Sequence, residues 1–357
     1  MKKLDWYIIK KFIGTFIFAI LIMAVISCVI DYNEKQEDFT IKNIPWGERL
    51  EYFKNFIPHI VALLFPLFIF IATIFFTSKI AYKSEIIAIL AGGVSYQRFL
   101  RPYIIGAVFL CGISFLANHY VVPAANKDRI AFENKYLHYT ASQSDRNIHL
   151  RLSKDLYVYM QSYDYVANMG YRFTAETISG TSLKEKLMAD RASYDTLKQE
   201  WTLYNVAVRT NNGISEKLEN HTELKKKYPF TPFDLEEDET IKEALTTPEL
   251  EKYIAREKLR GRETLNFFYV EKYRRTSQPV AGIILTIIGA CIASRKIRGG
   301  SGLHLALGIV ISALYIMALQ LTNTFSTKAG LEPIIAVWIP NMVFGVLALY
   351  LFIRQVR

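Results

Sequence analysis

The stretch Phe56–Ser78, FIPHIVALLFPLFIFIATIFFTS, carries no Asp, Glu, Lys or Arg over 23 residues. About 20 apolar residues are enough for a helix to cross the hydrocarbon core of a membrane. The six runs of this kind, each free of these charged residues, are Phe12–Ile30, Phe56–Ser78, Tyr103–Val122, Thr276–Ser294, Leu303–Thr327 and Pro333–Ile353. They predict six spanning helices, because a spanning segment must satisfy its own backbone hydrogen bonds. Their length disfavours the core helices of a large soluble protein.

The positive charge of the chain indicates its orientation. The formal net charge is +10. The loops and termini on one side of the six spans hold 13 Lys and Arg against two acids; these are segments 1–11, 79–102, 295–302 and 354–357. The net charge of the rest of the chain is −1. The positive-inside rule therefore predicts both termini in the cytoplasm and segment 123–275 outside it. Because the basic residues form short clusters beside the membrane, nucleic acid is not expected as a partner.

The exported segment 123–275 has the pattern of a β domain. Leu156–Tyr163, Tyr171–Ile178 and Trp201–Val208 are rich in β-forming residues, although the last alternates less strictly. Turn-forming residues separate them, which is typical of an antiparallel sandwich or barrel. Residues 214–245 are charged, and we expect them to be irregular.

We therefore expect a polytopic α-helical membrane protein with an inserted all-β domain. Its three parts are residues 1–122 with the first three spans, 123–275 with the exported β domain and flanking helices, and 276–357 with the last three spans.

The sequence contains no recognisable catalytic motif. It lacks the G-x-x-x-x-G-K-[ST] loop that binds nucleotide phosphates, the G-x-S-x-G nucleophile setting, and histidines at metal-ligand spacing. We expect no catalytic residue, no metal and no cofactor. A secondary transporter would show charges inside its spans and inverted repeats, and neither is present. A membrane-anchored binding or scaffold protein is the alternative to a transport subunit, although one span would suffice as an anchor.

Only one cytosolic loop, residues 79–102, is long enough to dock a partner. In it, Ser84 is expected to cap a short helix, with Glu85 in the first turn and Gly92 at the C-terminus. Glu85 has two interpretations at this point. It complements the helix dipole, or it is an exposed acid offered to a basic groove on a partner. From the residues alone, the first is slightly favoured.

Five motifs along the chain carry a family resemblance. They are LDWYIIK (4–10), SEIIAILAGG (84–93), YVVPAAN (120–126), TPEL (247–250) and RRTSQP (274–279). In this order they resemble the lipopolysaccharide export permease family (LptF/LptG), the paired F and G subunits of that transporter. The resemblance covers the whole chain, and the opening motif looks more like the G subunit.

The resemblance implies partners that the motifs do not show by themselves. The chain would form a heterodimer with a sister permease in the bacterial inner membrane. A cytosolic ATPase dimer would consume the ATP, so the chain itself would hold no cofactor. The cargo would be lipopolysaccharide, which a periplasmic β-jellyroll would hand to a bridge of similar jellyrolls.

The resemblance also implies roles for particular residues. The helix at 84–92 would be the coupling helix, and this favours the partner-binding interpretation of Glu85. Spans one and five, Phe12–Ile30 and Leu303–Thr327, would form the lateral gate. The residues expected to meet the ATPase are Glu85, Ile86, Ile89, Leu90 and Gly92. The outer end of span one departs from the family by being acidic. Lys35 and Lys42 are the nearest candidates for lipid phosphates, unless those contacts lie elsewhere or on the partner subunit.

Overall fold

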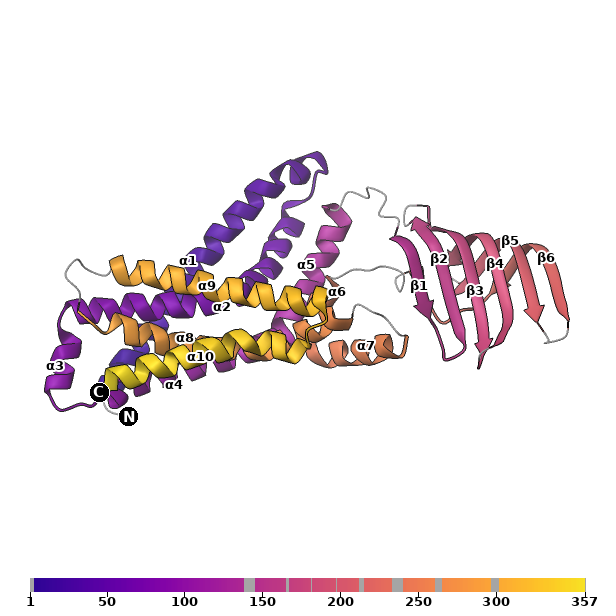
Figure 1. Cartoon of the computed structure of the whole chain (residues 1–357). Helices are drawn as coiled ribbons and strands as arrows, with labels where there is room; N and C mark the ends of the chain where they lie inside the picture. Colours follow the sequence, from indigo (N-terminus) through magenta and orange to yellow (C-terminus); the bar gives the residue numbers. More distant parts are fainter. Residues whose placement is uncertain are drawn as a thin grey trace. The chain divides into compact units, whose positions relative to one another are not determined.

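The structure is a computed structural model whose residues form two compact units (Figure 1). The helical unit comprises Met1–Leu137, Thr240–Glu251 and Asn266–Arg357. The sheet unit comprises His138–Glu239 and Lys252–Leu265. The described residues are 3–137, 145–164, 167–180, 182–196, 198–211, 215–232, 240–260, 265–296 and 302–356.

Long helices make up most of the helical unit. In chain order the helices of the described residues are α1 (Lys3–Ile41), α2 (Trp46–Tyr82), α3 (Glu85–Ala91), α4 (Tyr96–Leu116), the π-helical turn η1 (Ala117–Val121), α5 (Val122–Tyr136), α6 (Ile241–Ala244), α7 (Thr247–Arg260), α8 (Leu265–Ala293), α9 (Gly302–Ala329) and α10 (Pro333–Val356). Of these, α7 belongs to the helical unit only up to Glu251. The two chain termini and α3 lie at one end of this unit, which we call the terminal end (Figure 1). The opposite end, where α1 passes into α2, is called the hairpin end.

Six of these segments are long and apolar enough to cross a membrane. They are α1, α2, the continuous run from α4 through α5, α8, α9 and α10. The prediction of six spanning helices is therefore confirmed. The wide turn η1 lies just before Pro123, which has no backbone N–H to give to a regular helix.

The spans differ in how much of their surface is covered. In the most apolar window, 56% of α2 and 61% of α8 is buried, against 17% of α1 and 22% of α9. Close approach at Gly282 supports the tight packing of α8. A Cβ atom there would lie 2.8 Å from the Cys111 sulfur and 3.0 Å from the Phe65 ring. α2 and α8 thus form the centre of the bundle, and α1 and α9 lie at its periphery.

The hairpin end extends well beyond the charge-free runs. α1 continues from the predicted end of its span at Ile30 to Ile41, and α2 begins ten residues before Phe56. An aromatic cluster fills the space between these extensions and α5. Its buried members are the aromatic side chains Phe39, Tyr52 and Phe56 together with Ile44, and Tyr32, Phe53, Phe132 and Tyr136 pack against them. The long extensions therefore have an apolar core of their own.

The sheet unit contains one six-stranded antiparallel sheet. Its strands are β1 (Asp145–Arg151), β2 (Leu156–Asp164), β3 (Met169–Ser179), β4 (Ser182–Asp195), β5 (Glu200–Asn211) and β6 (Glu216–Lys226), and they pair in sequence order. The predicted inserted β domain is thus confirmed. Trp201 lies at the centre of its apolar interior, stacked on Phe230 at 4.8 Å, and its indole N–H donates to the Phe230 carbonyl at 3.0 Å.

A line of unpaired positions crosses all six strands without a shift in register, and we call it the unpaired seam. At the seam one residue per strand is skipped in the pairing, and these residues are Asn147, Gln161, Arg172, Asp190, Asn205 and Thr222. A separate register shift, next to Thr177 and Ile178, also leaves out Lys184 of β4. Asn147, Arg172 and Asn205 have positive φ, which residues other than glycine adopt rarely. Along a strand the buried side chains lie two residues apart, but across the seam the spacing is three residues, as from Leu203 to Val206 on β5. Both halves of strands β2 to β5 therefore turn their buried side chains to one interior.

The seam explains why the alternation predicted for residues 201–208 is imperfect, since the period of two is interrupted at Asn205. The expectation that residues 214–245 are irregular was wrong for β6 and for the short helix α6, while residues 214 and 233–239 lie outside the described part of the chain. This strand lies at the edge of the sheet with nearly every side chain exposed, so its sequence shows no apolar alternation. Its conformation comes from the hydrogen-bonded register with β5.

Candidate functional site

The predicted coupling helix is present as α3 at the terminal end. Its first turn differs from the expectation in one respect. Ser84 lies at the N-cap position with a left-handed backbone, φ 62°, and among the described residues its side chain makes no capping hydrogen bond. The Ser84 hydroxyl instead accepts a hydrogen bond from the Lys296 ammonium at 2.7 Å. Side-chain capping by Ser84 was therefore a wrong prediction, because a left-handed residue turns its side chain away from the helix N–H groups.

Glu85 occupies the first turn of α3, as predicted, and is half-buried. Its carboxylate accepts a hydrogen bond from the Tyr7 hydroxyl at 3.3 Å. The apolar residues of α3 face two ways. Ile86 is buried and Ile89 packs partly against the bundle core, whereas Leu90 is exposed. The exposed edge also contains Ile87, 54% exposed, which the sequence interpretation missed.

α3 ends at Gly92, as predicted. The Gly92 N–H donates to the Ala88 carbonyl at 3.0 Å, and Gly93 has a φ of +82°. Glycine adopts this left-handed conformation without a steric cost. The helix therefore stops after two turns and presents a short surface with an acid at one end and Ile87 and Leu90 along its exposed edge.

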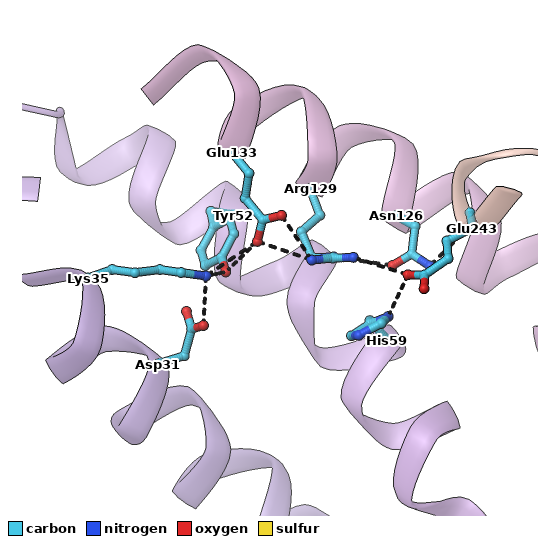
Figure 2. A network of polar contacts seen from close by, with 8 residues as sticks. All are labelled: Asp31, Lys35, Tyr52, His59, Asn126, Arg129, Glu133 and Glu243. Carbon is cyan, nitrogen blue, oxygen red and sulfur yellow. Dashed lines mark hydrogen bonds and ion pairs between the residues drawn. The ribbon is translucent and has the colours of Figure 1, made fainter. Parts of the chain in front are cut away.

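Lys35, a candidate for binding lipid phosphate, takes part in a polar network at the hairpin end (Figure 2). Its ammonium lies 2.7 Å from Asp31 and 3.3 Å from Glu133, and it also contacts the Tyr52 hydroxyl. Asp31 and Lys35 are one helical turn apart on α1, whereas Glu133 comes from α5. The Lys35 charge is thus compensated by two carboxylates within the chain.

Arg129 extends the same network toward α6 (Figure 2). Its guanidinium donates to both oxygens of Glu133, at 3.1 and 3.0 Å, and lies 3.5 Å from Glu243. His59 on α2 lies 3.9 Å from the Glu243 carboxylate, and the Asn126 amide donates to the Glu243 backbone carbonyl at 3.2 Å. The network therefore joins four helices that are far apart in the sequence, α1, α2, α5 and α6.

Lys42, the other phosphate candidate, lies near the tip of the hairpin. Its ammonium donates to the backbone carbonyl of Tyr136 at the end of α5. The structure therefore places Lys35 and Lys42 along one interface, between the α1–α2 hairpin and α5. Both lysines bind parts of the chain, and their role toward phosphate stays a prediction.

A second ionic cluster, on α8, was missed by the sequence analysis. Glu271 is almost fully buried and pairs with Arg275 at 3.1 Å and Arg274 at 2.7 Å. Arg275 also donates to the Thr247 hydroxyl and the Lys242 carbonyl, at 3.1 and 2.8 Å. The signal available in the sequence was the i,i+4 spacing of Glu271 and Arg275 just before the fourth span. The cavity between this cluster and the first network measures about 30 Å³, room for a single water.

The family of the chain is shown by a match over nearly its whole length. In a comparison with protein-family models, residues 6–354 match the lipopolysaccharide export system permease LptF/LptG. The chain belongs to the LptF/LptG permease family. No curated protein matches it. The LptF/LptG match confirms the resemblance predicted from the motifs, but it does not separate the F from the G subunit, so the preference for G stays a prediction.

As an LptF/LptG permease, the chain is a membrane-embedded transport subunit that serves lipopolysaccharide export together with a permease partner. The geometry fits a transport role because the helical unit combines tightly packed central helices with peripheral ones. Lightly packed helices are displaced at a lower free-energy cost than central ones.

Proposed function

We propose that the chain is the transmembrane subunit of an ATP-driven lipopolysaccharide exporter in the bacterial inner membrane. It pairs with a sister permease and takes the lipid from the membrane, while a separate cytosolic ATPase dimer binds and hydrolyses ATP. Both termini and α3 lie in the cytoplasm, and the sheet unit lies in the periplasm. The charge distribution along the sequence supports this orientation, because 13 Lys and Arg against two acids lie in segments 1–11, 79–102, 295–302 and 354–357.

The surface of α3 is the observation that carries this proposal. Its exposed apolar edge, Ile87 and Leu90, lies beside Glu85 at the basic end of the bundle. An amphipathic helix of two turns fits a groove on a partner through such anchors. Because the sequence has no nucleotide-binding loop, the energy for transport must come from that partner.

The exposed sides of α1 and α9 support pairing with a sister permease. Phe18, Leu21 and Val25 on α1 are all more than half exposed, as are Ile309 and Met317 on α9. These side chains face either lipid or a second helical subunit. In the proposed exporter they line the lateral opening through which the lipid enters between the two permeases.

The sheet unit supports the transfer of lipid to a bridge. Its interior is apolar over the whole width of the sheet, and the first and last strands each have one edge outside the sheet's own pairing. Sheet edges pair with further strands through main-chain hydrogen bonds. A periplasmic partner with the same kind of sheet would continue the apolar interior across the periplasm.

The charge reversal Glu85→Lys tests the coupling role. Like charge against a basic groove should lower ATPase binding and lipid export by about tenfold or more. The control is Glu332→Lys, an exposed acid in the α9–α10 turn at the hairpin end. The measurements are co-purification of the ATPase and export of lipopolysaccharide from reconstituted vesicles. If the Glu85→Lys variant binds the ATPase and exports lipid normally, α3 does not couple to the ATPase through this acid. If no ATPase and no sister permease co-purify with the wild-type protein, the scaffold function is favoured.

A further inference from the structure

The first turn of α3 is hydrogen-bonded to two other parts of the terminal end. Tyr7, in the second turn of α1, donates its hydroxyl hydrogen bond to Glu85 at 3.3 Å. Lys296, just after α8, donates to the neighbouring Ser84 hydroxyl at 2.7 Å. The two donors are 289 residues apart in the sequence and meet at adjacent residues of α3. Both contacts are made within the chain and join α3 to two other segments.

Each donor is connected to one of the two least buried spans. Tyr7 belongs to α1 itself. Lys296 lies in the turn between α8 and α9, where the His304 imidazole in the first turn of α9 contacts the Arg295 carbonyl at 2.9 Å. A displacement of Ser84 and Glu85 therefore reaches α1 through Tyr7 and α9 through the Lys296 turn. These are the helices that move at the lowest cost, because their packing against the bundle is the weakest.

A fixed point next to Tyr7 converts such a displacement into a movement of α1. Asp5 is buried and pairs with Arg98 at the start of α4 at 2.7 Å. At 3.6 residues per turn, Asp5 and Tyr7 point about 200° apart around the helix axis. α1 is thus held to α4 on one side and to α3 on the other. A pull on Tyr7 tilts or rotates α1 about the Asp5 contact.

We propose that Tyr7 and Lys296 are positioning residues that transmit the movement of α3 to the cytoplasmic ends of α1 and α9. The inference rests on the proposed function, because it assumes that an ATPase moves α3. Glu85 then has two neighbours, the ATPase on its outer side and Tyr7 on the side of α1. The left-handed Ser84 fits this role, since strained backbone persists where the surrounding contacts fix it.

The test uses Tyr7→Phe and Lys296→Gln in the full complex with ATPase and sister permease, reconstituted in vesicles that contain lipopolysaccharide. The matched controls are Tyr82→Phe and Lys11→Gln, exposed residues of the terminal end outside these contacts. The readout is the amount of lipopolysaccharide released per ATP hydrolysed, with ATPase binding measured alongside. Each test variant should keep its ATPase binding and hydrolysis within about twofold of wild type. It should release about fivefold less lipid per ATP, which corresponds to the net contribution of one typical hydrogen bond.

A second measurement follows the helices directly. Spin labels at positions 17 on α1 and 314 on α9, both exposed in mid-span, report the distance between these helices with and without ATP. The double variant Tyr7→Phe/Lys296→Gln should lose most of the ATP-dependent change that the wild type shows. An unchanged ratio of lipid to ATP in both single variants overturns the proposal. The proposal is also overturned if the control variants lose as much lipid release per ATP, or if the loss in the test variants accompanies weaker ATPase binding.

The two proposals fail in different ways. If the wild-type complex neither binds an ATPase nor exports lipid, the proposed function is wrong. If the wild type exports lipid and the Tyr7 and Lys296 variants export it with the wild-type yield per ATP, only the transmission role is wrong.

Discussion

Removal of the Lys35 charge distinguishes a structural lysine from a lysine that binds lipid phosphate. Lys35 lies between Asp31 and Glu133 (Figure 2). Its ammonium is 2.7 and 3.3 Å from their carboxylates, and its side chain is 20% exposed. Lys35→Met keeps most of the apolar length of the side chain and removes the cation. The two carboxylates then face each other, with Glu133 still paired to Arg129 and Asp31 left without its cation.

The expected loss in free energy of unfolding lies between the values known for exposed and for buried ion pairs. Exposed ion pairs contribute about 0–1 kcal/mol, and loss of one partner from a fully buried pair costs about 3–5 kcal/mol. The side chains of Asp31 and Glu133 are 13% and 15% exposed, so the site is intermediate. We expect Lys35→Met to lower the free energy of unfolding by about 2 kcal/mol. Lys35→Met/Asp31→Asn should regain at least half of this loss, because the uncompensated charge is gone.

The assay is chemical unfolding of the purified protein in mixed detergent micelles, with lipopolysaccharide binding measured on the folded variants. Lys54→Met is the control, since Lys54 is exposed on α2 in the same hairpin and should change stability by less than about 0.5 kcal/mol. Wild-type stability of Lys35→Met together with weaker lipopolysaccharide binding would refute the structural reasoning. That result would assign Lys35 to lipid phosphate, the role predicted from the family resemblance.

Two further predictions concern packing in each unit. Gly282→Ala places a methyl group against Cys111 and should lower the free energy of unfolding by about 1–3 kcal/mol, measured by the same detergent titration, while Gly112→Ala, whose Cβ meets no atom within 4 Å, should leave it unchanged or slightly raised. Equal effects of the two substitutions would contradict the close approach of α8. Trp201→Phe leaves the Phe230 carbonyl without its indole donor, so amide hydrogen exchange in β4 and β5 should accelerate by about tenfold or more, with exchange in α2 unchanged as the control.

The candidate site was only partly predictable from the sequence. Glu85 in the first turn of α3 and Gly92 at its end were predicted, because capping rules act between residues a few positions apart. The partners of Glu85 and Lys35 were not predictable. Tyr7 is 78 residues from Glu85, and Glu133 is 98 residues from Lys35. Contacts at such separations depend on which helices pack together, and the order of apolar residues along one helix does not contain this information.

The β domain shows the same division. The strands β2, β3 and β5 were predicted because their alternation has one buried face. β6 was missed because an exposed edge strand needs no buried face, and its pairing with β5 decides its structure. The unpaired seam was also invisible in the sequence, since it is defined by the alignment of unpaired residues across six strands.

The sequence by itself determined the six spans and the inserted β domain. The bilayer imposes this result, because it accepts only long apolar segments whose backbone hydrogen bonds are internal, and such segments are visible as charge-free runs. The tertiary structure alone decided that α2 and α8 form the centre while α1 and α9 remain peripheral, that Lys35 lies between two carboxylates, and that Tyr7 and Lys296 meet at α3. The physical reason is that all six spans are apolar on every side. Lipid and protein solvate such surfaces almost equally well, so only the fit of side chains between helices selects which faces become buried.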